Sequence, residues 1–311
     1  MDRVSTSATY QSALLNIMSA ESRQTDAQTQ VSTGKVASSL SGFGVQADTL
    51  TATRSLKSRI DSYVDNAKTL SSTLDVQDQA LGQLSDAAQS ARGAIAEAIA
   101  TGSADGLMTS LQGYLSQAVD SLNSNYQGRY LFAGGQSGTA PVGSLTLADL
   151  TAAPSTPSLF SNDQQTTTSR LDDKQTVSTG FLASSLGQPL FDALKAVEAL
   201  NQGGGGPLSG TLTQAQSTAL TGMLSQFDGA FDSLNTAVAQ NGSAQARVTA
   251  TQTSLVDRQT ALSGVLTGIT DVDMGAAVSK LQLSQTALQA SAQVFASLKA
   301  SSLLTILSTN A

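Results

Sequence analysis

The sequence predicts a mainly α protein: a long antiparallel coiled-coil or helical-bundle rod with amphipathic terminal helices and a small β-rich insert. Three observations predict this fold class. One apolar seam runs from Leu56 to Ala98, a second of similar length runs from Leu224 to Ile269, and a turn-rich segment interrupts the chain between them. A period of 3.5 residues held this long is typical of a straight helix whose apolar side faces another helix.

The first seam is almost entirely apolar, and Gln77 is its only polar member. Its positions alternate in steps of four and three residues: Leu56, Ile60, Tyr63, Ala67, Leu70, Leu74, Gln77, Leu81, Leu84, Ala88, Ala91, Ile95 and Ala98. Residues three or four apart lie on the same side of an α-helix, so this pattern predicts one continuous helical stripe.

The second seam is less apolar than the first, because four amide side chains interrupt it. Its positions are Leu224, Phe227, Phe231, Leu234, Val238, Asn241, Gln245, Val248, Gln252, Leu255, Gln259, Leu262, Leu266 and Ile269. Two seams of matched length separated by an insert predict the two arms of an antiparallel hairpin. The alternative is a pair of unrelated surface helices, each docked on its own core.

Composition narrows the function classes. Aromatic residues make up 4% and charged residues 13% of the 311-residue chain, and both values are low for a globular enzyme. The outward positions of the helices carry Ser, Thr, Gln, Asn and Ala, which can pack against neighbours without stranding charges. A net charge of −7 argues against a nucleic-acid partner.

Several kinds of site and segment are excluded by residues that the sequence does not contain. Cysteine and histidine are absent, which removes disulfides, thiol nucleophiles, the usual zinc sites and every histidine-based triad. Neither a cleaved signal peptide nor a membrane span is predicted, because the start lacks an apolar h-region and no run of eighteen apolar residues occurs. These rules alone predict a cytoplasmic protein.

The two ends of the chain are predicted to be amphipathic helices that pair with each other and with neighbouring chains. A helix over residues 5–31 carries Leu14, Ile17 and Met18, and residues 36–48 are predicted to be a loop. The last helix follows a start signal at residues 271–273. Its candidate subunit-interface residues are Leu281, Leu288, Phe295, Leu298, Leu304 and Leu307. A soluble monomer would gain nothing from exposing these apolar side chains at its end.

Between the seams, the pattern predicts a third helix over 107–122 and then a β-favouring run over 123–135. Residues 136–180 contain Pro and Gly turn formers and predict two to four short strands around Phe160, Leu171 and Val177. A turn-rich insert has few contacts with its surroundings, so residues 138–178 are predicted to be dispensable for the helices. A further helix over 180–200 precedes a flexible glycine run.

These elements predict three domains. Residues 1–45 and 272–311 form a terminal helical assembly domain, residues 46–135 and 181–271 form the long helical rod, and residues 136–180 form a small surface insert.

Four stretches of the sequence resemble the bacterial flagellin superfamily, and within it the hook–filament junction proteins. They are residues 31–35, residues 241–248, the end of the chain from residue 271, and a stretch similar to the junction signature "N…GrYLFaG". The signature residues are Asn123, Gly128, Arg129, Tyr130, Leu131, Phe132 and Gly134. The stretch 38–47 departs from the family pattern, because it lacks the acidic Asp-Asp-Pro signature.

The resemblance implies a structural subunit of the bacterial flagellum that forms the junction between hook and filament by helical self-assembly. It implies an extracellular location, export by the flagellar type III apparatus without a cleaved signal peptide, and an export chaperone. Copies of itself and neighbouring flagellar subunits are the implied partners. Nucleic acid, membrane, small-molecule substrate, metal and cofactor are not expected, and the protein is not expected to be an enzyme.

Two alternatives stay open at this point: a filament flagellin, and a cytoplasmic coiled-coil signalling or adaptor protein. The paired carboxylates at 172–173 and at 271 and 273 are interpreted as turn and helix-cap residues rather than catalytic groups. Tyr130 and Phe132 are interpreted as inward-facing core residues, because no basic cluster surrounds them to bind RNA.

Overall fold

The computed structural model describes residues 2–308, with the side chains of residues 8–300. Its helices are α1 (Asp2–Thr33), α2 (Ala47–Thr101), α3 (Leu107–Leu122), α4 (Leu147–Ala152), α5 (Ala183–Gln202), α6 (Gln214–Thr270) and α7 (Met274–Ser308), with 3₁₀ turns η1 (Leu40–Gln46) and η2 (Thr156–Leu159). Its strands are β1 (Asn125–Tyr126), β2 (Arg129–Tyr130), β3 (Thr168–Arg170) and β4 (Thr176–Ser178). The mainly α fold class is confirmed.

The chain forms two compact units. One comprises Met1–Arg59 with Arg258–Ala311, and the other comprises Ile60–Asp257. The predicted division into assembly domain, rod and insert stays a prediction, because packing alone does not define those roles.

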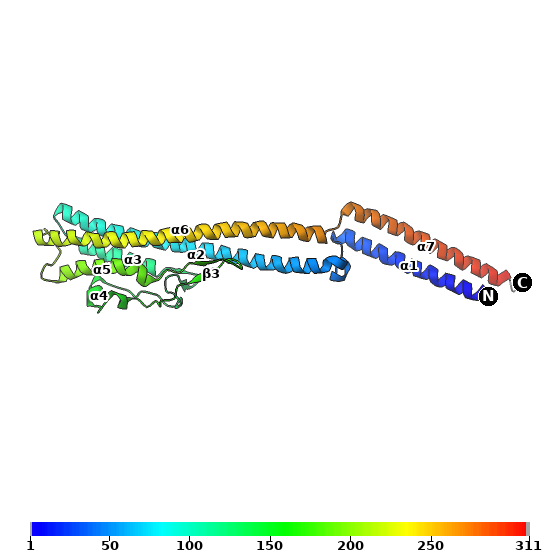
Figure 1. Ribbon diagram of the computed structural model, residues 1–311, viewed down its shortest axis with the longest axis horizontal. Helices are drawn as coiled ribbons and strands as arrows, with labels where there is room; N and C mark the ends of the chain where they lie inside the picture. Colours follow the sequence, from blue (N-terminus) through cyan, green and yellow to red (C-terminus); the bar gives the residue numbers. More distant parts are fainter. Residues whose placement is uncertain (1, 309–311) are drawn as a thin grey trace. The chain divides into compact units, whose positions relative to one another are not determined.

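The predicted antiparallel pairing of the two long helices is confirmed inside the second unit. The contacts between α2 and α6 fix the direction of the pairing: Asn241 Nδ2 donates to the carbonyl oxygen of Leu74 at 3.0 Å, Ser85 Oγ meets Asn235 Oδ1 at 3.5 Å, and Arg92 forms an ion pair with Asp228. As the residue numbers rise along α2, those of the partners fall along α6. Figure 1 shows the two helices side by side with α3 and α5 along one side.

The main core of this unit lies where α2, α3, α5 and α6 meet. It is built mostly from leucine and alanine and includes Leu81, Leu84, Leu111, Leu115, Leu190, Leu194, Phe191 and Phe227. The helix periodicity places these residues on facing sides, so their burial stabilises the four helices together.

The insert packs more closely on the helices than the sequence predicts. Leu171 and Val177 are buried in a second cluster with Leu74 and Val248, one residue from each long helix. Leu147 joins the main core. The turn-rich composition suggested few crossing contacts, but single apolar residues spaced along the insert each reach a helix. The expectation that the insert makes few contacts with the helices, on which the predicted dispensability of residues 138–178 rests, is therefore wrong.

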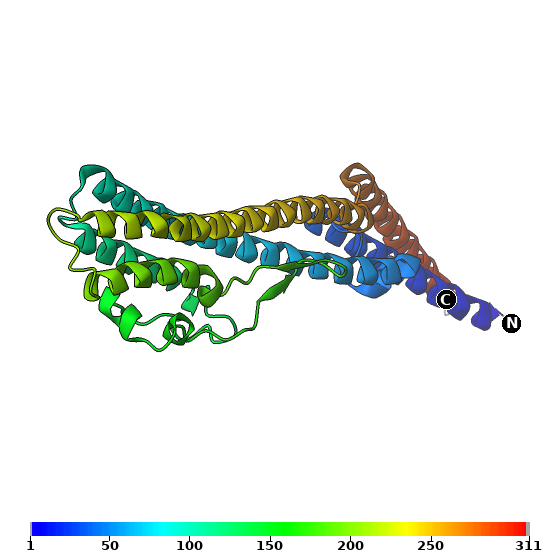
Figure 2. The same ribbon diagram turned by 60° about the vertical axis from the view of Figure 1, so that its left-hand side comes forward.

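The expected number of short strands in the insert is confirmed, although one segment differs. β3 and β4 form an antiparallel hairpin, visible in Figure 2 beside the long helices, and Val142 bridges to Phe160. The alternating run before Leu147 ends in a helix instead of a strand. Thr146 Oγ1 accepts the Asp149 N–H at 3.3 Å and Asp149 accepts the Thr146 N–H at 2.7 Å, a capping box that starts α4.

Candidate assembly site

The first unit contains the pair of terminal helices α1 and α7, and polar contacts hold the base of this pair. Val36 N–H donates to the Thr270 carbonyl oxygen at 2.8 Å, and Val272 N–H donates to that of Gly34 at 3.0 Å. Beside these backbone bonds, the Lys35 ammonium group forms an ion pair with the Asp271 carboxylate. Gly34 has φ +68°, a left-handed value typical of the residue that follows a helix end, and α1 ends at Thr33.

The contacts of this base shift the titration of the Asp271 carboxylate. Its hydrogen bond from Lys35, followed by one from Thr270, lowers its pKa below the ordinary value of 3.8. The folded state therefore binds the proton less tightly than the unfolded chain does. The stabilisation is fully present above pH 3.8 and is lost as the pH falls through the lower folded-state pKa.

We therefore expect Asp271→Asn to lower the thermal midpoint near neutral pH and to have a smaller effect below pH 3. The measurement is thermal unfolding followed by circular dichroism from pH 7 to pH 2. Asp86→Asn provides the control, because Asp86 is exposed in the middle of α2, belongs to the other compact unit and forms no ion pair among the described residues. A midpoint difference that does not change with pH would contradict this role of Asp271.

Small residues hold α1 and α7 close together. The buried residues with described side chains on these two helices are Ala20 and Ala27 of α1 and Ala277 and Ser284 of α7, all with small side chains. Near the free end of the pair, the Tyr10 hydroxyl donates to the carbonyl oxygen of Leu298 at 2.9 Å. The Tyr10 ring meets Phe295 edge to face, with the ring centroids 6.1 Å apart. Figure 1 shows the two helices side by side.

Because small residues fill the interior, several larger apolar side chains of the pair face outward. On α1, Leu14 is 50% exposed, Leu15 is 65% exposed and Met18 is 57% exposed. On α7 the exposed apolar residues are Met274, Val278, Leu283 and Val294, with Leu283 at 71%. We call these seven side chains, which occupy more than one side of the helix pair, the apolar terminal face. Monomeric proteins rarely expose so many large apolar side chains on one pair of helices, so the pair is a candidate interaction surface.

The predicted interface residues with described side chains divide into an exposed group and a half-buried group. Leu14 and Met18 belong to the apolar terminal face. Ile17, Leu281, Leu288, Phe295 and Leu298 are half-buried. The side chains of Leu304 and Leu307 lie outside the described residues. Sequence reasoning missed Leu15, Leu283 and Val294, because they lie off the main apolar stripe of their helices. They could have been found as apolar residues one or two positions from a residue of that stripe.

The signature residues form a tight corner between α3 and α5. Gln127 and Gly128 have φ +51° and +77°, the left-handed pair of a two-residue type I′ turn that connects β1 to β2. Asn123 holds the start of the insert, since its Nδ2 donates to the Val142 carbonyl oxygen at 2.8 Å and its Oδ1 accepts the Val142 N–H at 3.1 Å.

The aromatic residues of this corner face inward to different degrees. Phe132 is buried, and its carbonyl oxygen accepts the Ala183 N–H at 2.9 Å. Tyr130 and Leu131 are half-buried, and Arg129 is exposed. Gly134 has φ +67°, and a Cβ atom there would lie 2.2 Å from a carboxylate oxygen of Asp163. Only glycine fits this close approach.

The paired carboxylates act as turn and cap residues, as the sequence predicts. Asp172 accepts the backbone N–H groups of Lys174 and Gln175 at 2.7 Å each. Asp273 accepts the Ala276 N–H at 3.1 Å at the start of α7. Within the described part of the chain, no cluster of three or more acidic side chains could hold a metal ion, and none of the helices is apolar enough over sufficient length to cross a bilayer.

Comparison with known proteins identifies both ends of the chain. Residues 4–137 match the family model of the bacterial flagellin N-terminal helical region, and residues 224–307 match that of the bacterial flagellin C-terminal helical region. The two matches include both long helices and both terminal helices. No curated protein matches the sequence.

Two solved structures share the fold at low sequence identity. A protein of Vibrio parahaemolyticus assigned as a flagellar hook-associated protein aligns over 73% of this chain and 99% of its own, with a TM-score of 0.59 and 17% identity. FlgL of Bacillus cereus aligns over 70% of this chain and 98% of its own, with a TM-score of 0.52 and 15% identity.

Proposed function

This chain belongs to the bacterial flagellin family, and we propose that it is a structural subunit of the flagellum that joins the hook to the filament. The observation that carries the proposal is the apolar terminal face, because it lies on the two segments that the flagellin family models match. The junction position is supported by the signature corner and by the fold shared with FlgL and the hook-associated protein.

In this proposal the terminal helices associate with copies of the chain and with neighbouring flagellar subunits. Each contact removes large apolar side chains of the terminal face from water, and burial of one Leu or Met yields roughly 1.5–3 kcal/mol. Many outer positions of the long helices carry uncharged Ser, Thr, Gln, Asn and Ala side chains, which can pack against neighbours without burying a charge. The role is structural and non-enzymatic. In this proposal, a chaperone escorts the protein, and the flagellar apparatus exports it without cleavage of a signal peptide.

The terminal face predicts a variant that folds but does not assemble. The double variant Leu15→Ser and Leu283→Ser should keep the thermal midpoint of the parent, because both side chains are largely exposed. It should lose polymer formation in sedimentation and electron microscopy. The matched control, Leu15→Met with Leu283→Met, keeps the face apolar and should still assemble. Normal polymers from the serine variant would exclude this face as the contact.

The junction role is tested by deleting the gene in its own organism. Cells without a junction should build hooks that carry no filament and should release filament protein into the medium, because exported filament subunits find no place to bind. A filament flagellin is the second candidate, since the family models describe flagellins in general. Its loss would leave bare hooks with no filament protein in the medium.

A further inference from the structure

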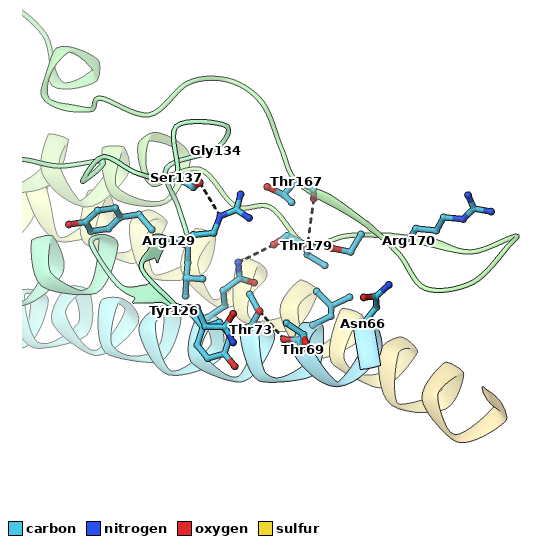
Figure 3. Close-up of a pocket in the computed structure, with 16 residues that line it drawn as sticks. Asn66, Thr69, Thr73, Tyr126, Arg129, Gly134, Ser137, Thr167, Arg170 and Thr179 are labelled. Atoms are coloured by element: carbon cyan, nitrogen blue, oxygen red, sulfur yellow. Dashed lines mark hydrogen bonds between the residues drawn. The ribbon is translucent and has the colours of Figure 1, made fainter. Parts of the chain in front are cut away.

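A polar cavity of about 490 Å³ lies beside the signature corner. Its walls come from α2, from the β1–β2 hairpin and from the start of the β3–β4 hairpin, as Figure 3 shows. Thr69 and Thr73 line it from α2, Tyr126 and Arg129 from the first hairpin, and Thr167 from the second. Its size is in the range of protein ligand sites.

The cavity is positively charged in a chain that is acidic overall. Two arginines line it and no aspartate or glutamate does, whereas the chain as a whole has a net charge of −7. Arg170 is occupied by its own turn, where it donates to the carbonyl oxygens of Asp172 and Asp173 and forms an ion pair with the Asp173 carboxylate at 3.5 Å, so Arg129 carries the uncompensated charge. Arg129 donates through Nε to Ser137 Oγ at 3.1 Å, and among the described residues it has no ion-pair partner.

Figure 3 shows the Arg129 side chain directed from β2 toward Thr167. Its terminal guanidinium nitrogens can therefore donate to a group held between the two hairpins. A guanidinium forms its strongest hydrogen bonds with a carboxylate, and the pair is often bidentate. The charge of the cavity thus favours an acidic ligand.

The β3 strand presents an open edge at this cavity. In the β3–β4 ladder, Thr179 N–H donates to Thr167 and Leu171 N–H donates to Gln175, so residues 167, 169 and 171 use their backbone groups inside the hairpin. In an antiparallel pair the alternate residues point the other way. The N–H and C=O groups of Thr168 and Arg170 are therefore directed outward, and no described residue pairs with them.

The open edge and the cavity lie on the same side of the hairpin. Thr167, Ser169 and Arg170 line the cavity from the side of β3, whereas the side of β4 contributes only Thr179, which follows the strand and lies opposite Thr167. β4 instead borders α6, where Arg247 donates to the Thr176 carbonyl oxygen at 3.3 Å. A segment in the cavity could thus pair with β3 as an added strand, the way many proteins bind extended peptides.

We propose that this cavity binds an extended protein segment that carries an aspartate or glutamate. The segment adds a strand to the outer edge of β3 through the backbone groups of Thr168 and Arg170, and its carboxylate accepts hydrogen bonds from Arg129. The threonine hydroxyls of α2 and the Gln77 amide form a polar floor below it. This binding does not depend on the junction role, because it uses residues outside the apolar terminal face.

The test uses the full-length chain and two acetylated, amidated peptides, Thr-Val-Asp-Val-Thr and Thr-Val-Asn-Val-Thr. Nuclear magnetic resonance titrations measure the affinity of each. The aspartate peptide should bind about tenfold more tightly than the asparagine peptide, as expected for a charge-assisted hydrogen bond. Arg129→Gln should abolish that preference, and Arg54→Gln, which removes an exposed arginine elsewhere on α2, should preserve it.

Amide hydrogen exchange supplies an independent measurement of strand addition. The aspartate peptide should slow exchange at Thr168 and Arg170, whereas Ser169, already bonded within the hairpin, should change little. Absence of binding, equal affinity for the two peptides, or binding without slower exchange at Thr168 and Arg170 would each overturn the proposal. Binding of polygalacturonate without that protection would assign the cavity to an acidic glycan instead.

Discussion

Replacing Leu74 with aspartate is expected to lower the free energy of unfolding by about 4 kcal/mol or more. Leu74 is completely buried beside Leu171, Val177 and Val248. The substitution removes the burial of a leucine, which typically costs 2–5 kcal/mol, and adds the cost of a carboxylate with no partner. The measurement is urea unfolding followed by circular dichroism at 222 nm.

Leu56→Asp is the matched control for that variant. It introduces the same charge into the same helix, but Leu56 is partly exposed, so the effect should be small. Leu74→Ala separates the two terms, because it removes the leucine without adding a charge. If Leu74→Asp and Leu56→Asp lower stability equally, then the pairing of α2 with α6 at this position is wrong.

Removal of the insert is expected to lower the free energy of unfolding of the helices as strongly as Leu74→Asp does. Replacing residues 138–178 with a short Gly/Ser linker removes several side chains from the two cores, and each contributes roughly 1.5–3 kcal/mol by burial. Those side chains are Val142, Leu147, Leu150, Leu171 and Val177. The linker variant should unfold at a clearly lower urea concentration than the parent, with a smaller dependence on denaturant because less surface is exposed.

Point variants of the β3–β4 hairpin identify which of its side chains stabilise the helices. Leu171→Ala and Val177→Ala should each reproduce a share of the loss, while Thr168→Ala, an exposed residue of the same hairpin, should not. A linker variant as stable as the parent would show that the insert rests on the helices without stabilising them.

The two long helices could be predicted from the sequence because their pattern is periodic over many turns. Leu74 and Val248 lie on stripes that only one kind of packing satisfies, and the structure brings them together. The polar interruptions of the seams also fit. Asn241 is buried, and its Nδ2 donates to the Leu74 carbonyl oxygen and to Asp78 at 3.2 Å.

Tertiary relationships without a period could not be predicted in this way. The single apolar residues of the insert give no pattern. The sequence therefore places Leu171 and Val177 in a small core of the insert without showing which helix residues they contact. On α7, apolar residues occupy several faces of the helix, and the outward position of Leu283 depends on which small residues face α1. The cavity depends on the β3–β4 register, which no local sequence signal determines.

The signature corner could be predicted only in part. The glycines at 128 and 134 could be assigned to left-handed positions, because the two-residue turn and the close approach to Asp163 require them. The free guanidinium of Arg129 could not be anticipated, since it depends on the absence of a carboxylate nearby in space rather than in sequence.

The central claim is the place of this subunit in the flagellum, and immunogold labelling of intact cells tests it most directly. An antibody raised against the insert should label one narrow band where the hook meets the filament. Labelling along the whole filament would contradict the junction role and assign the chain as a filament flagellin. Absence of label from flagella, with the protein confined to the cell interior, would contradict a structural role in the flagellum.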